Sequence, residues 1–389
     1  MSGAGIAGPA LAFWLRRYGL APTVIERAPG LRDSGQNVDV RGAGREVLHR
    51  MGIEARVRAG GTGEVGLRFV DDEGRAVAEF PVGDGDGPTA GLEILRGALA
   101  RILIESCGDE VEFVYGTRIE SVEQDETGVD VTLSEGSTRH FDLVIVAEGI
   151  RSTTRNEVFG SEPDYRDLGY YTAYCTIPTT SDDDQWWRWY STTGGRSVQL
   201  RPDNVGSTRA CLNFPSPPTG LDLLNRKAQA RALQEVYGDV GNAAPRVLAC
   251  LADDPSSLYV DRIAQVRLPS WSKGRVAVVG DAAYCATPIS GMGTSLALIG
   301  AYLLAGELAD ASDHTAAYAA YEKRMRPFVD QAQKLRPGVP RIINPTSLLG
   351  VRILRTVVRL AGTAPVRALA ARLTSSSDDA DPTLPDYDR

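Results

Sequence analysis

Residues 3–8 read Gly-Ala-Gly-Ile-Ala-Gly, the GxGxxG pattern of a turn that binds a dinucleotide. A helical stretch follows as far as Tyr18, and residues 22–26 (Pro-Thr-Val-Ile-Glu) have the pattern of a β-strand. In such a βαβ unit the glycines permit a tight turn, close approach of the backbone to a pyrophosphate and close packing of helix on strand. Glu26 ends the strand about 20 residues after the motif begins, where a carboxylate can accept both ribose hydroxyls. The stretch therefore predicts an α/β fold built around a dinucleotide.

The strand before this glycine loop is nearly absent from the sequence. Such a loop normally follows about five apolar residues that form the central strand of the sheet, and here only Met1 and Ser2 precede Gly3. Either the sheet is incomplete or the start of the chain has been assigned too late. We favour the second interpretation, because every later element has an intact pattern.

A second informative stretch is residues 274–283 (Gly-Arg-Val-Ala-Val-Val-Gly-Asp-Ala-Ala), which predicts a buried parallel strand. The strand carries Asp281 to the carboxyl edge of the sheet, where ligands of open α/β folds bind. Residues 288–293 then lead into an apolar helix. Gly291 and Gly293 leave unobstructed N–H groups at the start of that helix, and such groups suit the negative charge of a reduced flavin.

The remainder of the first domain contains further charged residues next to predicted elements. Asp39 and Arg41 precede one predicted helix, and Arg96 begins another. The sequence alone is equally consistent with a surface position and with a place in a binding site for these three charged residues. Residues 141–147 (Phe-Asp-Leu-Val-Ile-Val-Ala) predict another buried parallel strand, which ends at Glu148.

The pattern changes between residues 165 and 270. Short β-like segments separated by Pro, Gly and Asp/Ser turns predict an inserted sheet domain. Three of the five tryptophans cluster there with a tyrosine, at Trp186, Trp187, Trp189 and Tyr190. Ordinary packing within a sheet and an aromatic substrate pocket are both consistent with this cluster.

Composition excludes several classes of function. A formal net charge of -8 argues against a nucleic-acid partner, because phosphate binding requires a concentrated surplus of Lys and Arg. Three histidines, none in an acidic or glycine-rich setting, disfavour a Ser-His-Asp hydrolase and a metal site. Five scattered cysteines without a CxxC pair suit a reducing compartment, so we expect a cytoplasmic location. We therefore expect the chemistry to come from a cofactor.

The termini and the apolar segments do not predict a membrane protein. The N-terminus lacks the basic leading region of a signal peptide, and the longest apolar run, residues 294–306, is shorter than the roughly 20 residues that span a bilayer. Residues 348–373 predict amphipathic helices with interspersed arginines, either packed across two domains or lying on a membrane surface. The polar, acidic segment from residue 375 onward predicts a disordered tail.

Taken together, the GxGxxG turn with Glu26, Arg96, the strand end at Glu148 and the GDAA…P..G.G stretch at 280–293 resemble the single-component FAD monooxygenases of the para-hydroxybenzoate hydroxylase family. The chain is most similar to their tetracycline-inactivating and polyketide-tailoring branches, as far as about residue 330. The resemblance implies a mixed α/β chain with a Rossmann-like FAD-binding domain, an inserted β-sheet substrate domain and C-terminal helices. The implied ranges are 1–164 and 271–330 for the FAD-binding domain, 165–270 for the substrate domain, 331–374 for the C-terminal helices and 375–389 for the tail.

The resemblance also implies which residues hold cofactors. Arg32 matches a loop arginine that contacts the nicotinamide cofactor, NADPH or NADH, and Ile119 is a candidate backbone partner of adenine. Three positions depart from the family pattern, with Glu148 in place of Asp, Tyr284 in place of His and Thr294-Ser295 in place of Asn. The first of these puts a nicotinamide-linked role for Glu148 in doubt. The full set implied for cofactor binding is Gly3, Gly5, Ile6, Ala7, Gly8, Glu26, Arg27, Arg32, Asp39, Arg41, Arg96, Ile119, Asp281, Pro288, Gly291, Met292 and Gly293.

The activity implied by the resemblance is oxygen transfer. Hydride passes from NAD(P)H to FAD, O2 adds to give a C4a-hydroperoxyflavin, and one oxygen atom enters an aromatic or polycyclic small molecule. No side chain is assigned to proton transfer, and no metal is expected. We expect a monomer or homodimer without nucleic-acid or membrane partners. A dehydrogenase or reductase of the same fold and a non-catalytic flavin-binding protein are the alternatives; a halogenase is disfavoured because Trp187-Arg188-Trp189 does not match that group's signature.

Overall fold

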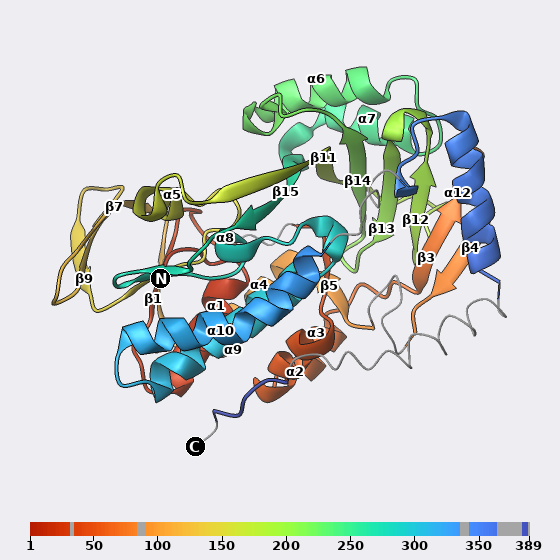
Figure 1. The fold of residues 1–389 in the computed structure, drawn as a ribbon. Coiled ribbons are helices and arrows are strands. Elements are labelled where there is room, and N and C mark those ends of the chain that lie inside the picture. The colour runs from red at the N-terminus through yellow and green to blue at the C-terminus, as the bar shows by residue number, and fades with distance from the viewer. Residues whose placement is uncertain (32–34, 84–90, 335–341, 364–382, 388–389) are drawn as a thin grey trace.

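The computed structural model describes residues 1–31, 35–83, 91–334, 342–363 and 383–387. Two sheets form its framework (Figure 1). One is a parallel sheet next to the long helices α9 and α10, and the other is a larger, mainly antiparallel sheet with α6 and α7 on one face. The predicted mixed α/β fold is confirmed.

The parallel sheet surrounds the glycine loop. Its strands pair as β1 with β6 and as β10 with β17, both in parallel, and β17 also pairs with the short β16. Ser2 forms parallel bridges with Ile25 of β1 and with Val146 of β10, and so joins the two pairs. Met1 and Ser2 thus lie where the central strand was expected. The strands are β1 (Thr23–Glu26), β6 (Glu112–Tyr115), β10 (Val144–Val146), β16 (Ser272–Lys273) and β17 (Val276–Val278).

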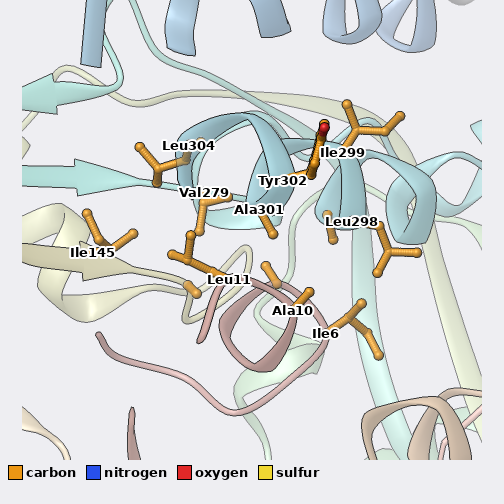
Figure 2. Close-up of a cluster of buried hydrophobic side chains, with 14 of the residues drawn as sticks. Ile6, Ala10, Leu11, Ile145, Val279, Leu298, Ile299, Ala301, Tyr302 and Leu304 are labelled. Carbon is orange, nitrogen blue, oxygen red and sulfur yellow. The ribbon is translucent and has the colours of Figure 1, made fainter. Parts of the chain in front are cut away.

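Helices α1 and α9 pack against each other and onto this sheet (Figure 2). Helix α9 is apolar on every side, and its residues from Ser295 to Glu307 are all buried, which explains the longest apolar run of the sequence. Leu11 and Ala10 of α1 meet Leu298 of α9 in this core. The helices of this part are α1 (Ala7–Arg17), α2 (Gly42–Arg50), α3 (Glu54–Ala59), α4 (Arg96–Cys107), α5 (Thr153–Phe159), α8 (Asp281–Tyr284), α9 (Gly293–Asp310) and α10 (His314–Gln333).

Two small antiparallel sheets complete this part of the molecule. β2 pairs with β5, which places Asp39 opposite Glu93 at one end of a short ribbon. The second of these sheets is the ribbon β7–β8–β9, in which β8 pairs with both of its neighbours. The strands are β2 (Asn37–Asp39), β5 (Glu93–Leu95), β7 (Ile119–Gln124), β8 (Val129–Leu133) and β9 (Thr138–Phe141).

The larger sheet has the strand order β15-β11-β14-β13-β12-β3-β4. Apolar side chains of its central strands alternate toward α6 and α7 and form a second core with them. The elements are β3 (Gly66–Val70), β4 (Ala76–Pro81), β11 (Asp164–Pro178), β12 (Trp186–Ser191), β13 (Ser197–Pro202), β14 (Ser207–Pro215), β15 (Tyr259–Arg267), α6 (Arg226–Tyr237) and α7 (Ala244–Asp253), with short 3-10 turns η1 (Thr193–Gly195), η2 (Leu221–Leu223), η3 (Pro255–Ser257) and η4 (Pro288–Ser290).

The boundary of the predicted substrate domain needs one correction. β3 and β4 lie within residues 66–81, which the sequence assigned to the FAD-binding domain, yet they form one edge of the larger sheet. The reason is a long-range contact: β3 pairs in parallel with β12, from Gly66 beside Trp186 to Val70 beside Tyr190. Such pairing leaves no local pattern in the sequence.

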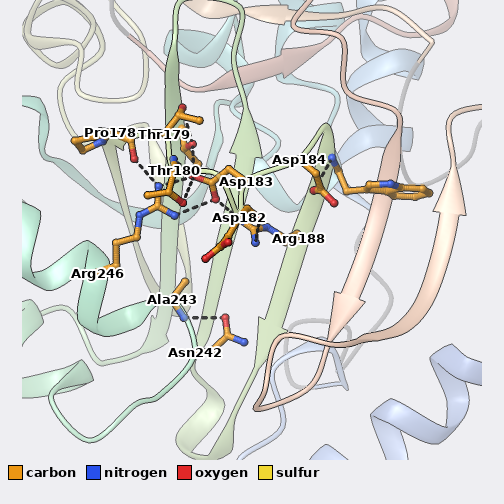
Figure 3. Close-up of polar contacts among 12 residues, drawn as sticks. Pro178, Thr179, Thr180, Asp182, Asp183, Asp184, Arg188, Asn242, Ala243 and Arg246 are labelled. Carbon is orange, nitrogen blue, oxygen red and sulfur yellow. Dashed lines mark hydrogen bonds and ion pairs between the residues drawn. The ribbon is translucent and has the colours of Figure 1, made fainter.

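An ionic cluster holds the connection between β11 and β12 against α7 (Figure 3). The buried carboxylate of Asp183 forms ion pairs with Arg188 of β12 and with Arg246 of α7. It also accepts hydrogen bonds from the backbone of Thr180, at 2.9 Å, and from the hydroxyl of Thr208, at 3.1 Å. Asp183 therefore joins the loop between β11 and β12 to strands β12 and β14 and to helix α7.

The C-terminal part contains one confirmed helix and one correction. Helix α12 (Leu348–Ala361) packs Leu354 and Val358 against Ala78 of β4, and Figure 1 shows it along that edge of the sheet. The expected disordered tail is wrong for residues 383–387, because Tyr387 is buried against Gly306 of α9 and donates a hydrogen bond to Glu307. The remainder of the expected tail lies outside the described residues.

Candidate cofactor site

The glycine loop has the close contacts that only glycine permits. Gly3 has φ +106°, and a Cβ atom there would lie 2.5 Å from the carbonyl oxygen of Ala147. A Cβ atom at Gly8 would lie 1.9 Å from the carbonyl oxygen of Gly3. Ile6 caps α1, which begins at Ala7, so the positive end of the helix dipole faces the loop. At Gly5 the nearest atom is the Arg96 guanidinium, 3.4 Å from an added Cβ.

Glu26 is fixed at the edge of this loop. Its carboxylate accepts hydrogen bonds from the backbone N–H groups of Ala4 and Ala28, each at 2.8 Å. Arg27 beside it is exposed. The side chain of Ile119 is buried in the core, which leaves only its backbone for contact with a ligand. Arg32 lies outside the described residues.

Asp281 and Arg96 come from distant parts of the sequence, and their charges interact in the fold. Burial by protein raises the pKa of the Asp281 carboxyl, the charge of Arg96 acts in the opposite direction, and Asp261 raises the pKa further. Asp281 is nevertheless exposed to solvent. A carboxyl group that protein surrounds but water reaches lies in a recess of the surface. Asp281 Oδ1 is also 3.7 Å from the Cβ position of Gly293, so three predicted site residues line this recess.

Asp39 and Arg41 belong to the same region and are not free surface charges. Their side chains form an ion pair at 2.9 Å with both groups largely buried. The backbone N–H of Arg41 donates to the hydroxyl of Ser295 at 2.9 Å, which ties β2 to the first turn of α9. The Arg41 side chain also lies 4.0 Å from the Cβ position of Gly291, which has φ +63°. Pro288 and Met292 precede α9 as part of η4 and as its N-cap.

The two departures at Glu148 and Tyr284 have structural explanations. The carboxylate of Glu148 accepts hydrogen bonds from the hydroxyls of Ser2, Ser152 and Thr154 and from the backbone of Thr154. Its acceptor positions are therefore occupied within the fold. Tyr284 is buried against α9, and a Cβ atom at position 300 would lie 1.9 Å from its hydroxyl. A residue larger than glycine at that point of α9 would collide with Tyr284.

Arg155 is a residue that the sequence interpretation missed. It is fully buried and donates to the carbonyl oxygens of Ala282, at 3.0 Å, and Ile150, at 2.9 Å. It therefore joins the segments that follow β10 and β17, the two strands that lead to Glu148 and Asp281. Burial lowers its pKa. In the sequence it stands among polar residues, where nothing distinguishes it from a surface arginine.

One face of the larger sheet adjoins this recess. Trp189, Gln199, Cys211, Tyr174 and Tyr259 are successive cross-strand neighbours from β12 to β15, so their side chains share a face. Tyr259 is 48% exposed although burial raises its pKa, and so it too lies in a recess.

Tyr259, at the end of this row, belongs to β15, the strand that packs against α8. The Tyr259 hydroxyl donates to Asp261 at 2.7 Å, and Arg151 forms an ion pair with Asp261 at the same distance. β15, which carries Asp261, packs against α8, which begins at Asp281, and the charge of Asp261 raises the pKa of Asp281.

The tryptophan cluster packs mainly with itself. The ring centroids of Trp187 and Trp189 are 5.5 Å apart, and Trp189 stacks on Phe69 at 5.8 Å. Tyr190 points to the opposite face, into the core with α6 and α7. These contacts are those of ordinary sheet packing, whereas Tyr174 and Tyr259 lie at the other end of the row, on β11 and β15.

The residues present fit a flavin dinucleotide. The glycine cradle and Glu26 suit its ADP half, and the recess at Asp281 beside the first turn of α9 suits a flavin ring. The fold and site thus define a dinucleotide-binding flavoprotein. The chain belongs to the family described as FAD binding domain, whose profile matches residues 2–335.

Similar proteins identify the reaction class. The flavin-dependent monooxygenase eupH of Phoma sp is 38% identical, with 93% of this chain and 91% of the relative covered. The FAD-dependent monooxygenase asL4 of Sarocladium schorii is 34% identical over 92% and 91%. The crystal structure of the tetracycline destructase Tet(51) matches with a TM-score of 0.82 and 32% identity, over 99% of this chain and 98% of that chain. The chain is an FAD-dependent monooxygenase, an oxidoreductase that uses NAD(P)H and O2.

The length and the apolar character of the helices decide whether any of them could cross a membrane. Within the described ranges, no helix is both long and apolar enough to cross a membrane.

Proposed function

We propose that this enzyme hydroxylates an aromatic or polycyclic small molecule at the recess between Asp281 and the tyrosine end of the larger sheet. The observation that supports the proposal is that the solvent-exposed carboxyl of Asp281 lies beside Gly293 and within reach of the charge of Arg96, on a helix that packs against β15, the strand of Tyr259. Charged groups that hold a cofactor and an aromatic surface that accepts a flat substrate are thereby adjacent. The similarity to a tetracycline destructase favours a polycyclic substrate.

The residues of this chain have separable roles in the proposal. The glycine cradle, Glu26 and the start of α1 bind the ADP half of FAD, whose pyrophosphate suits the positive end of the helix. Asp39, Arg96 and Asp281 position the flavin half. The N–H groups of Gly293 and Thr294, in the first turn of α9, would stabilise negative charge on the ring of bound FAD, whereas the N–H of Gly291 already donates to the carbonyl of Pro288 at 3.1 Å. When bound, FAD supplies hydride acceptance and oxygen activation. The protein orients the substrate, excludes water and polarises the ring.

Three further parts of the proposal concern the surroundings of the site. Arg27 and the Ile119 backbone contact the adenosine end, and Arg32 contacts the nicotinamide cofactor. Pro288 and Met292 shape the wall next to the flavin. We further propose that the protein acts in the cytoplasm as a monomer or homodimer.

The experiment starts from the purified protein. It should be yellow, and NADH or NADPH should bleach its flavin without oxygen in the presence of a polycyclic phenol such as a tetracycline. With labelled dioxygen, one labelled atom should enter the product. Turnover without label would instead indicate a dehydrogenase. A yellow protein that neither nucleotide reduces would indicate a flavin-binding protein without catalysis.

The substitution Asp281→Asn, with Asp313→Asn as a control, tests the assignment of the site. Asp313 caps α10 away from the recess. Asp281→Asn should weaken FAD binding by about tenfold, as expected for loss of one charge-assisted contact. Equal FAD affinity in both variants would contradict the placement of the flavin.

A further inference from the structure

A single arginine of the larger sheet is surrounded by three carboxylates. Arg201 on β13 has a largely buried guanidinium that binds both oxygens of Glu64, at 2.7 and 3.0 Å. It also lies 3.5 Å from Asp39 and 3.8 Å from Glu93. The three carboxylates come from three separate segments: the approach to β3, the end of β2 and the start of β5. Sequence patterns do not bring these segments together.

The charges of this cluster do not balance. Three carboxylates face Arg201, and Asp39 additionally pairs with Arg41, so the fully ionised group has one negative charge in excess. Asp39 Oδ1 and Glu93 Oε1 accept no hydrogen bond from the described residues. Thr62 donates to the other oxygen of Glu93. A buried charge without compensation is costly, so the cluster favours the binding of one proton.

Glu64 has the most deeply buried carboxylate of the three, with 2% of its side chain exposed against 6% for Glu93 and 10% for Asp39. Its pKa is raised to about 7, chiefly by burial and also by the charges of Glu93 and Asp39, while Arg201 acts in the opposite direction. Burial raises the pKa of Glu93 as well. The charged groups that face Glu64 are therefore Arg201 from β13, Glu93 from β5 and Asp39 from β2.

The cluster continues to the proposed flavin site on one side and to the larger sheet on the other. Asp39 holds Arg41, whose backbone is tied to Ser295 and whose side chain lies beside Gly291. On the sheet, the Arg201 guanidinium stacks on the Trp187 ring at 4.3 Å. Arg201 thus connects the Trp187 ring on the larger sheet, through Asp39 and Arg41, to the first turn of α9.

We infer that Arg201 is a positioning residue for the flavin: it holds Asp39 and Arg41 against the start of α9, and the proton balance of its three carboxylates sets how tightly that region binds FAD. The inference rests on the proposed flavin site and adds that pH regulates FAD binding there. Loss of the shared proton adds a negative charge near an anionic cofactor. FAD should therefore bind more weakly as the pH rises through 7.

The test measures the FAD dissociation constant by flavin fluorescence at pH 6 and pH 8. The wild-type protein should bind FAD about fivefold more weakly at pH 8, a moderate coupling between two sites. Glu64→Gln retains the shape of the side chain and cannot ionise, so its affinity should be the same at both pH values. Glu307→Gln is the matched control, because Glu307 is also a buried glutamate paired with an arginine, Arg324, but at the far end of α9. It should retain the wild-type pH dependence.

A second variant separates positioning from support of the fold. Arg201→Lys keeps the charge and loses the two-pronged contact with Glu64. It should weaken FAD binding at both pH values and shift the visible absorption of the bound flavin, whereas a purely structural role would lower only the free energy of unfolding. Two results would overturn this inference and leave the proposed function intact. The wild type could bind FAD with the same dissociation constant at both pH values, or the Glu64→Gln variant could show the pH dependence of the wild type. A wild type that binds no FAD at either pH would overturn the proposed function with it.

Discussion

At the scale of single residues, the site depends on positions where a side chain is forbidden and on positions where a charge is enclosed. Gly8 is of the first kind, because the carbonyl of Gly3 occupies the space that a Cβ atom would need. Asp183 is of the second kind, because two guanidiniums compensate its buried charge. Each kind of position leads to a prediction that a single substitution can test.

Gly8→Ala should abolish FAD binding and lower the free energy of unfolding by about 2 kcal/mol, since the backbone of the loop must shift to admit the methyl group. Urea unfolding and flavin fluorescence measure the two effects. Gly30→Ala is the control, because no atom lies within 4 Å of its Cβ position and its φ is not in the left-handed region. If Gly8→Ala bound FAD as the control does, the cradle would not be the binding site for the pyrophosphate.

Asp183→Asn should lower the free energy of unfolding by about 2 kcal/mol at pH 7, the usual contribution of hydrogen bonds to a charged group. Burial alone would raise the pKa of Asp183, but hydrogen bonds from Arg246 and Thr180 and the charge of Arg188 outweigh it and hold the pKa at about 2. Because this value is below the unfolded value of 3.8, the contribution of Asp183 is complete above that pH and decreases as the pH falls toward 2. The difference between wild type and variant, measured by urea unfolding, should therefore shrink below about pH 4. A difference that stayed constant down to pH 3 would contradict the ionic role of the cluster.

At the scale of elements, helix α12 is apolar on two sides. Leu354 and Val358 are buried against β4, whereas Leu349, Ile353 and Val357 are more than half exposed. The buried side attaches the helix to the edge strand of the larger sheet and covers that edge. The exposed side contributes little to the stability of the isolated chain.

Leu354→Ala should therefore lower the free energy of unfolding by about 2 kcal/mol, because it leaves a cavity against Ala78. Ile353→Ala, one residue away on the exposed side, should change it by less than about 0.5 kcal/mol. Equal effects of the two substitutions in urea unfolding would show that α12 does not pack on β4 in solution.

Elements also mark the limit of prediction from the sequence. The glycine turn, the strand that ends at Asp281 and the apolar helix α9 were predictable, because each depends on residues that are neighbours along the chain. The parallel pairing of β3 with β12 was not predictable, because the amino-acid sequence of a strand does not indicate which distant strand it pairs with. Arg155 and Arg201 were missed for a related reason: a buried arginine and a surface arginine have the same local sequence. Tyr387 was assigned to a disordered tail because the pocket beside Gly306 lies far away in the sequence.

At the scale of the whole molecule, the proposed cofactor would contact segments that are far apart along the chain, from Gly3 to Gly293. FAD binding should therefore stabilise the complete fold and not one part of it. At a free FAD concentration of 100 times the dissociation constant, the free energy of unfolding should rise by about 2.7 kcal/mol. Thermal and urea unfolding should show one shifted transition. An unshifted transition would mean that FAD also binds the unfolded chain or does not bind at all.

The connection made by Ser295 has a consequence for how the enzyme is made. The hydroxyl of Ser295 holds the backbone of Arg41, and the charge of Arg96 acts on Asp281, so the recess joins residues 254 and 185 positions apart in the sequence, as in other folds in which an inserted domain interrupts the first. During synthesis the glycine loop leaves the ribosome long before α9 exists. With FAD at the proposed site, the nascent chain would lack half of its cofactor contacts until α9 has been translated. Cofactor loading would then be a late event in the biogenesis of this enzyme, and a chain that stalls before α9 should emerge without colour.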